Sequence, residues 1–178
     1  GPAPSVRLFG YTGYGTEDPA RVAAENLVFT KQTRLEMTPE LMDEIRGWSQ
    51  ARLSEELAYM ANTVPSSWEF VSYNFIITNV TRAFTHQLVR TRTGSYAQQA
   101  MRVLNVKGWK YTTGPTVGND EERGDVYDQV MGGIAAGYDR LNELGSKVED
   151  ARGVLPTNIQ TNICVSFNLR AFVDLARK

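Results

Sequence analysis

The stretch THQLVRTRTGSYAQQAMRV, residues Thr85 to Val103, decides how this chain is interpreted. It brings Arg90, Arg92 and Arg102 together around serine, tyrosine and glutamine residues. Like charges repel, so a cluster of this kind costs free energy unless a partner of opposite charge is present. The net charge of the whole chain is only -1, so the positive charge is confined to this cluster and not spread over the protein. We therefore expect the cluster to bind a local partner.

The residue types in this stretch indicate what the partner is. Arginine offers planar, bidentate donors that match phosphate oxygens, and glutamine offers a donor and an acceptor to the edge of a uracil or flavin ring. Gly94 allows the backbone to approach a ligand closely. The stretch therefore favours a phosphorylated heterocyclic ligand. The alternative is a surface loop laced with weak salt bridges.

Length and composition describe an ordinary globular chain. The 178 residues fit one domain, 1–178, with 42% apolar and 22% charged residues. A net charge of -1 and the lack of a basic, aromatic-lined face argue against a nucleic-acid-binding module. The apolar runs are too short to cross a membrane, and the start, GPAPSVRLFG, does not have the pattern of a secretory signal. Its first two residues fit a protease scar.

One cysteine, Cys164, and one histidine, His86, limit the possible chemistry. A disulfide framework and a His- or Cys-rich metal site cannot be built from them, so we expect no metal. A Ser-His-Asp triad would have to use His86, which fits a packed helix residue better. The cysteine usage fits a reducing, cytoplasmic compartment. Because Cys164 lies in the apolar run ICVSF, we expect it in the core.

The first half of the chain shows three kinds of pattern. A helix is predicted from about Pro19, and one longer helix over 38–62, where Thr38 suits the N-cap. Residues 68–79 alternate apolar and polar side chains, which predicts a half-buried strand. Residues 80–90 return to helical spacing and carry Arg90 to the C-terminal end, where a cation is favoured. Residues 91–96 lack periodicity and are predicted to form a loop.

The second half repeats the alternation of helix and strand. Residues 103–121 are loop-like, and 124–144 form a predicted helix that Gly145 ends. A short helix over 148–155 stops at Pro156, a strand covers 159–167, and a last helix begins at Asn168. That helix reaches Lys178 in mid-pattern, so we expect the natural protein to continue. The elements predict an α+β fold, with a small antiparallel or mixed sheet flanked by long helices.

The segment RAFTHQLVRTRTGSYAQQAMR resembles the signature of the flavin-dependent thymidylate synthases. That signature is Arg-His-Arg, seven residues, Ser, and Arg two residues later, usually preceded by THQLVR. SSWEFVSYNFIITNVTRA, VEDARGVLPTNIQT and FNLRAF resemble further segments of the family. The similarity runs from about Trp68 to Lys178 in the right order, and a constellation of this kind is far more specific than a lone motif.

The resemblance implies a fold like that family's and a known chemistry. Such an enzyme binds FAD, takes hydride from NADPH, and moves a one-carbon unit from methylenetetrahydrofolate to C5 of a uracil nucleotide. No enzymic cysteine attacks the ring. The family builds each active site from several subunits of a homotetramer.

Matching the segments residue by residue implies the following site. The positions nearest the chemistry are Arg90, Arg102 and Ala100. The flavin contacts are Ser66, Glu69, Arg90, Arg92, Thr93, Gln98, Asn168 and Arg170. The nucleotide contacts are Gln87, Gln98, Gln99, Ala100, Met101, Arg102 and Arg152.

Four positions depart from the family pattern. Thr91 replaces the signature histidine, Ala100 the signature serine, and Phe70 and Val64 two further histidines. Losing the serine hydroxyl makes room beside the nucleotide, and one branch of the family, in polyoxin-type antibiotic pathways, methylates UMP instead of dUMP. The altered signature favours a methylase of UMP or dUMP. The alternatives are a degenerate relative that binds flavin or nucleotide without turnover, and an ordinary dUMP-specific thymidylate synthase.

Overall fold

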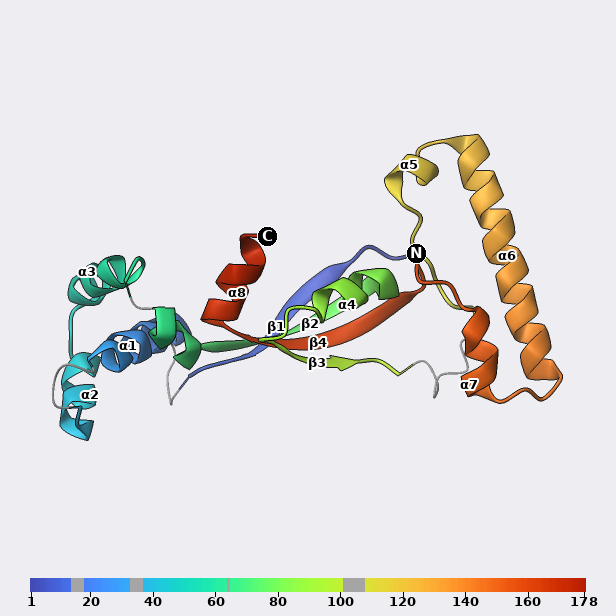
Figure 1. The fold of residues 1–178 in the computed structure, drawn as a ribbon. Helices are drawn as coiled ribbons and strands as arrows, with labels where there is room; N and C mark the ends of the chain where they lie inside the picture. Colours follow the sequence, from blue (N-terminus) through green and yellow to red (C-terminus); the bar gives the residue numbers. More distant parts are fainter. Residues whose placement is uncertain (14–17, 33–36, 64, 101–107) are drawn as a thin grey trace. The chain divides into compact units, whose positions relative to one another are not determined.

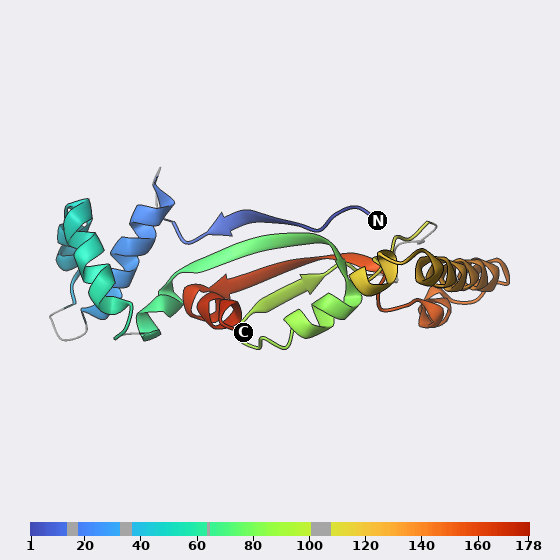
Figure 2. The same cartoon turned by 90° about the horizontal axis from the view of Figure 1, so that it is seen from above.

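A computed structural model describes residues 1–13, 18–32, 37–63, 65–100 and 108–178. Within this part of the chain, one sheet has four strands, β1 (Ser5–Tyr11), β2 (Ser72–Thr81), β3 (Ser95–Gln98) and β4 (Gln160–Asn168). The strand order is β1-β2-β4-β3, which Figure 2 shows from above. The strands are antiparallel: β1 runs from Ser5, bonded to Thr78, towards Thr12, bonded to Ser72. The predicted α+β class is confirmed.

Helices connect and flank the strands (Figure 1). The α-helices are α1 (Pro19–Lys31), α2 (Pro39–Arg46), α3 (Gln50–Met60), α4 (Arg82–Leu88), α5 (Pro115–Gly118), α6 (Glu121–Glu143), α7 (Val148–Ala151) and α8 (Leu169–Ala176). Two 3₁₀ helices are η1 (Pro65–Phe70) and η2 (Arg152–Val154). Within the described residues, no helix is both long and apolar enough to cross a membrane.

The chain divides into two compact units, each made of separate segments. Unit 1 comprises Gly1–Val6, Ile77–Arg90 and Ala97–Cys164. Unit 2 comprises Arg7–Ile76, Thr91–Tyr96 and Val165–Lys178. Because β1 to β4 each contribute residues to both units, neither unit is a continuous piece of sequence. The single domain expected from length stays a prediction.

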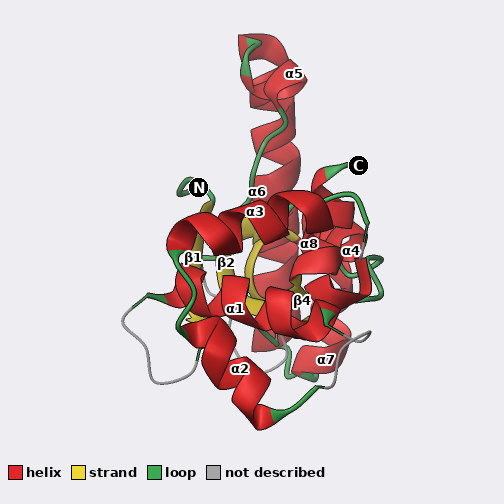
Figure 3. Ribbon diagram, turned by 90° about the vertical axis from the view of Figure 1, so that its left-hand side faces the viewer, coloured by secondary structure: helices red, strands yellow, loops and turns green. Residues whose placement is uncertain are grey.

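Unit 2 has a helical core. The side chains of Val28, Ile45, Leu53, Met60 and Val71 are almost fully buried and form one apolar cluster. They come from α1, α2, α3 and Val71, the residue just before β2, and Figure 3 shows these three helices gathered together. Burying a large aliphatic side chain contributes roughly 1.5–3 kcal/mol, so this cluster holds the three helices in place.

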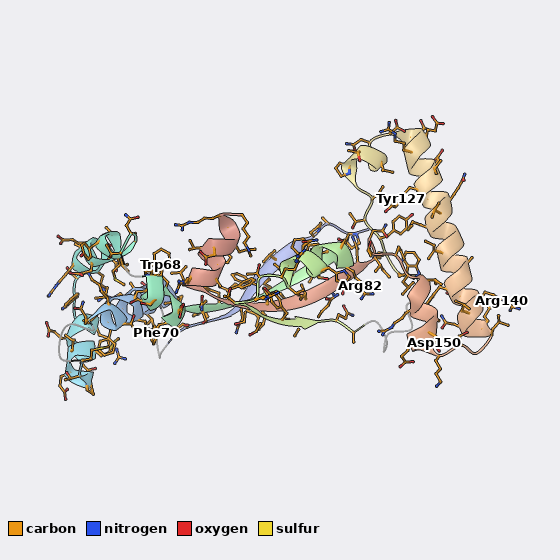
Figure 4. All side chains as sticks on the ribbon, in the orientation of Figure 1. Trp68, Phe70, Arg82, Tyr127, Arg140 and Asp150 are labelled. Carbon is orange, nitrogen blue, oxygen red and sulfur yellow. The ribbon has the colours of Figure 1, made fainter. Side chains whose placement is uncertain are left out.

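Unit 1 is organised around α4, α6 and β4. Asp120 caps α6 by accepting a hydrogen bond from the backbone N–H of Arg123 at 2.9 Å, and Gly145, at φ +81°, follows the helix end. On α6, Tyr138 is fully buried, and the Tyr127 hydroxyl accepts a hydrogen bond from the Asn158 amide at 2.6 Å. Figure 4 labels Tyr127 on this helix. These contacts attach the long helix to the segment that leads into β4.

The predicted long helix over 38–62 is wrong in one respect. The structure breaks it into α2 and α3 at Gly47, Trp48 and Ser49. Ser49 begins α3 as its N-cap, accepting from the backbone N–H of Arg52 at 3.2 Å. A capping serine satisfies a helix N–H that would otherwise lack a partner, so two capped helices replace one continuous helix.

Three strand boundaries also differ from the prediction. Residues 65–70 form η1, so β2 begins at Ser72 and not at Trp68, and it continues to Thr81. Ser95 and Tyr96, predicted as loop, begin β3. β1 had not been predicted. Its residues are exposed apart from the half-buried Gly10, so it is held by pairing with β2 and not by a buried face of its own.

Candidate functional site

The loop of residues 91–94, which carries Arg92 in unit 2, is held by Tyr96. The Tyr96 hydroxyl donates a hydrogen bond to the backbone oxygen of Thr91 at 2.6 Å, and its ring meets that of Phe167 edge-on at 5.9 Å. Burial raises the pKa of Tyr96, so the hydroxyl keeps its proton and remains a donor. Thr91 is itself buried, whereas Arg92 and Thr93 are exposed. The loop therefore turns inward at Thr91 and presents the next two side chains to solvent.

Gly94 makes this loop possible by its lack of a side chain. A Cβ at this position would lie 2.5 Å from Cε1 of Phe167 and 2.8 Å from the Tyr96 hydroxyl. Real Cβ atoms do not approach other atoms so closely, and here the neighbouring ring is buried. A glycine is thus required by close approach, which positions Arg92 and Thr93 next to it.

The predicted flavin contacts from η1 and α8 meet in unit 2. Arg170 pairs with Glu69 across η1 and α8, with 2.7 Å between Nη1 and Oε1. Asn168 ends β4 and caps α8 by accepting from the backbone N–H of Ala171 at 2.8 Å. Ser66 is exposed on η1, the 3₁₀ helix that also carries Glu69. The structure brings Glu69 and Arg170 together as partners of each other, and Asn168 already serves as a helix cap.

A cavity of about 330 Å³ lies beside this ion pair. It is lined by Ala61, Asn62, Thr63, Pro65, Trp68, Arg170, Asp174 and Arg177. Two arginines and one aspartate give the wall a net positive charge, and Trp68 adds an aromatic surface (Figure 4). Sequence reasoning missed Arg177 and Trp68 as site candidates. The signal for Arg177 was its place seven residues after Arg170, where helical spacing predicts the same face; in the structure it is the C-cap residue of α8.

Unit 1 holds those predicted nucleotide contacts that the structure describes. On α4, Thr85 and Leu88 are buried, so Gln87 and Arg90 are left exposed. The backbone N–H of Arg90 bonds the Gln87 carbonyl at 3.2 Å just past the helix end. The predicted delivery of Arg90 to the C-terminal end of this helix is confirmed. Arg152 is also exposed, and its Nε donates to the Glu149 carbonyl at 3.3 Å.

The end of β3 is tied to β4 by amide groups. The backbone N–H of Gln99 donates to the Asn162 carbonyl at 3.0 Å, and the Asn162 side-chain amide donates to the Gln99 side chain at 3.0 Å. Gln98 is half-buried, and Gln99 and Ala100 are exposed. Asn162 was missed by sequence reasoning because it appears as one polar residue in an alternating strand. Met101, Arg102 and Val64 lie outside the described residues.

Cys164 is not the core residue that its apolar surroundings predicted. The alternation of β4 buries Thr161, Ile163 and Val165, and leaves Cys164 half-buried on the opposite side. Its side of the strand also carries Asn162. The sequence ICVSF hides this, because valine and isoleucine on either side of a cysteine make the whole run apolar.

Comparison with known proteins decides the family. The family model described as thymidylate synthase complementing protein matches residues 13–178. The chain belongs to this family. The resemblance carried by the arginine signature is therefore confirmed.

Several curated members of the family align with the chain. A flavin-dependent thymidylate synthase of Geobacter sulfurreducens is 36% identical over 107 residues, covering 59% of this chain and 46% of that protein. Another from Nitratidesulfovibrio vulgaris is 32% identical over 147 residues, 78% of this chain and 59% of that protein. The chain spans about half the length of the curated relatives it matches.

A solved structure shares the fold. The crystal structure of the UMP/dUMP methylase PolB from Streptomyces cacaoi, bound with 5-Br dUMP, has a TM-score of 0.75. The match covers 97% of this chain and 76% of that one, at 17% sequence identity. The expected flavin-dependent thymidylate synthase-like fold is thereby confirmed.

Proposed function

We propose that this protein is a flavin-dependent methyltransferase that methylates C5 of a uracil nucleotide, UMP or dUMP. Methylenetetrahydrofolate supplies the carbon, and reduced FAD supplies the hydride. The observation that carries the proposal is the family match over residues 13–178 together with Arg90 and Arg92, the two signature arginines, whose side chains are exposed.

The donor set in unit 2 fits part of a flavin dinucleotide. Arg92 offers an exposed guanidinium two residues before Gly94, whose missing side chain leaves room for the ring of Phe167 and the hydroxyl of Tyr96 and not for a ligand. Arg170 and Arg177 line a cavity with Trp68, which suits a phosphate next to a planar ring. The volume of about 330 Å³ is at the lower end for ligand pockets, so it would hold one part of FAD. Ser66, Glu69, Arg90, Thr93, Gln98 and Asn168 complete the proposed set.

Bound FAD would supply the hydride transfer, and the chain's own groups would bind and orient the reactants. Exposed Gln87, Arg90, Gln99 and Arg152 are the described donors for the nucleotide, and Met101 and Arg102 are proposed to join them. Guanidinium groups bind the phosphate, and amides bind the ring edge. Ala100 replaces the family's serine at the end of β3, which leaves room beside the sugar for the 2′-hydroxyl of UMP.

The proposal uses no cysteine nucleophile. Cys164 lies in the middle of β4, a regular strand whose neighbouring residues alternate in burial. Activation of a thiol needs a neighbouring cation or a helix N-terminus. The half-buried position nevertheless makes a direct test necessary.

The proposed assembly is a homotetramer in the cytoplasm, with NADPH as the reductant of the flavin. Segments that carry flavin and nucleotide contacts face different subunits in the family. If a site spans an interface, assembly and ligand binding are linked, and dilution lowers the affinity for flavin. Analytical ultracentrifugation with and without FAD tests this: a monomer with full activity would contradict the tetramer.

Two alternatives are tested by one assay. UMP and dUMP are incubated separately with the chain, FAD, NADPH and methylenetetrahydrofolate, and the bases are analysed by mass spectrometry. A degenerate binder takes up FAD and nucleotide without forming methylated product. A dUMP-specific synthase methylates dUMP alone. The methylase proposed here acts on UMP, and a chain that remains colourless in FAD near neutral pH would rule out a flavoenzyme.

A further inference from the structure

Three amide groups of unit 1 form a chain of hydrogen bonds that ends at a proposed nucleotide contact. The backbone N–H of Asn79 donates to Oδ1 of Asn162 at 3.0 Å. Nδ2 of Asn162 then donates to Oε1 of Gln99 at 3.0 Å. Asn79 adopts φ +58°, a left-handed conformation that asparagine tolerates, at the end of β2 where the N–H turns towards the side chain of Asn162.

The direction of this series of hydrogen bonds is fixed by its first donor, the backbone N–H of Asn79. A backbone N–H can only donate, so the Asn162 atom that receives it must be the carbonyl oxygen. The amino group of Asn162 is therefore the atom that faces Gln99, and it in turn requires the Gln99 carbonyl oxygen. The donor at Asn79 therefore fixes the orientation of both side-chain amides. The Gln99 amino group is left at the end that faces away from Asn162.

The register of β3 against β4 holds this series of hydrogen bonds in place. The backbone N–H of Gln99 bonds the Asn162 carbonyl at 3.0 Å, so the two residues are neighbours in the β3–β4 ladder. Asn162 is half-buried, whereas Gln99 is exposed. The half-buried amide is thus the fixed member of the pair, and the exposed amide is the member that meets a ligand.

We propose that Asn162 is a positioning residue that fixes the Gln99 amide with its amino group outward, so that Gln99 selects a base carrying a carbonyl acceptor. Uracil presents an oxygen at C4, whereas cytosine presents an amino group there. An outward amino group pairs with the oxygen and leaves two donors facing each other at cytosine, which costs an unsatisfied buried group. The inference rests on the proposed function for its ligand class, and it assigns the discrimination of uracil from cytosine to Gln99 and Asn162.

Two single-atom exchanges reverse the polarity. In Asn162→Asp one carboxylate oxygen still accepts from Asn79, but the other can only accept, so it draws in the Gln99 amino group and turns the Gln99 carbonyl outward. In Gln99→Glu one oxygen accepts from Asn162 and the other faces outward as an acceptor. Both variants should therefore accept a hydrogen bond from the amino group of CMP and lose the preference for UMP.

The test measures dissociation constants for UMP and CMP by calorimetry with the FAD-loaded chain. The wild type is expected to bind UMP more tightly than CMP, and each variant should lower the ratio of the two affinities by roughly tenfold or more. An added negative charge repels the phosphate of both nucleotides equally, so it cancels in the ratio. Asn119→Asp, at an exposed residue after α5, adds the same charge and should leave the ratio unchanged.

The outcomes separate the inference from the proposed function. If Asn162→Asp and Gln99→Glu both keep the wild-type ratio, the inference is overturned. Gln99→Glu alters an exposed side chain, so its result decides the inference even if Asn162→Asp fails to fold. The affinity ratio can be measured even if the protein shows no turnover, so it still decides the inference. A lack of turnover would contradict only the proposed methylation. A wild type that binds neither nucleotide overturns both.

Discussion

Arg170 forms an ion pair with Glu69 although the two residues lie far apart in the sequence, with 2.7 Å between their nearest nitrogen and oxygen. Both side chains are roughly half exposed, at 44% and 48%. Exposed pairs contribute little stability, at most about 1 kcal/mol, so the guanidinium can exchange its partner at low cost. The pair therefore orients Arg170 at the edge of the unit 2 cavity while leaving it available for a phosphate.

Arg170→Ala should weaken FAD binding by about tenfold or more, because a charge-assisted hydrogen bond is worth roughly 1.5–3 kcal/mol. The change in the free energy of unfolding should stay below about 1 kcal/mol. Flavin fluorescence titration and chemical denaturation measure the two quantities. Arg140→Ala is the matched control, since Arg140 also forms an exposed ion pair, with Glu143 at 3.2 Å. Equal FAD affinity in both variants would remove Arg170 from the flavin site.

Gly94→Ala should destabilise the fold by roughly 1–3 kcal/mol, because the new methyl group would collide with the ring of Phe167 and the hydroxyl of Tyr96. Moving the loop also displaces Arg92 and Thr93, so FAD affinity should fall. Gly133→Ala is the control: nothing lies within 4 Å of its added methyl group, and in the middle of α6 it should stabilise by up to about 1 kcal/mol. A Gly94→Ala variant as stable as wild type would show that the loop has room.

Sequence patterns predicted the elements that carry strong periodicity. The helices at α1, α6 and α8 and the strand β4 were found because local spacing of apolar residues encodes them. The break at Gly47 was missed because Ile45 and Leu53, on either side of it, keep a helical spacing of eight residues. β3 was missed because four residues at a sheet edge gain their stability from pairing with β4, a contact that no local pattern records.

The sequence proposes residues for the site, but it does not show which side chains they contact. Resemblance to the family proposes Arg90, Arg92 and Arg170 as ligand contacts, and their role stays a prediction. The pairing of Arg170 with Glu69, and of Gln99 with Asn162, depends on strands and helices that meet only after folding. The burial of Thr91 was hidden for the same reason, since its neighbour Arg92 is exposed and no sequence period distinguishes them.

Cys164→Ser should keep measurable turnover, because in the proposed route hydride from the flavin reduces the methylene adduct and no thiolate has to attack the ring. The substitution removes a half-buried thiol but retains a small side chain, so the fold should survive. Steady-state rates and FAD absorbance are compared with those of the wild type. A folded variant that binds FAD and nucleotide yet shows no turnover would indicate cysteine chemistry.

Ala100→Ser should shift the preference from UMP towards dUMP. Ala100 is exposed just past β3, where the family carries a serine near the nucleotide, and the missing hydroxyl leaves space for a 2′-hydroxyl. Crowding that hydroxyl or leaving it unpaired costs about 1–3 kcal/mol, or roughly tenfold in relative efficiency. The ratio of kcat/KM for the two nucleotides is measured in both proteins. An unchanged ratio that strongly favours dUMP would indicate an ordinary dUMP-specific thymidylate synthase.

The most direct test of the central claim is single-turnover conversion of UMP by the wild-type chain carrying pre-reduced FAD, with isotopically labelled methylenetetrahydrofolate. Mass spectrometry of the recovered nucleotide shows whether the labelled carbon has reached C5 of the uracil ring. We expect labelled 5-methyl-UMP to form at the rate at which reduced FAD is reoxidised under anaerobic conditions. Recovery of unlabelled UMP from a chain with FAD and nucleotide both bound, and dUMP equally unchanged, would contradict the account.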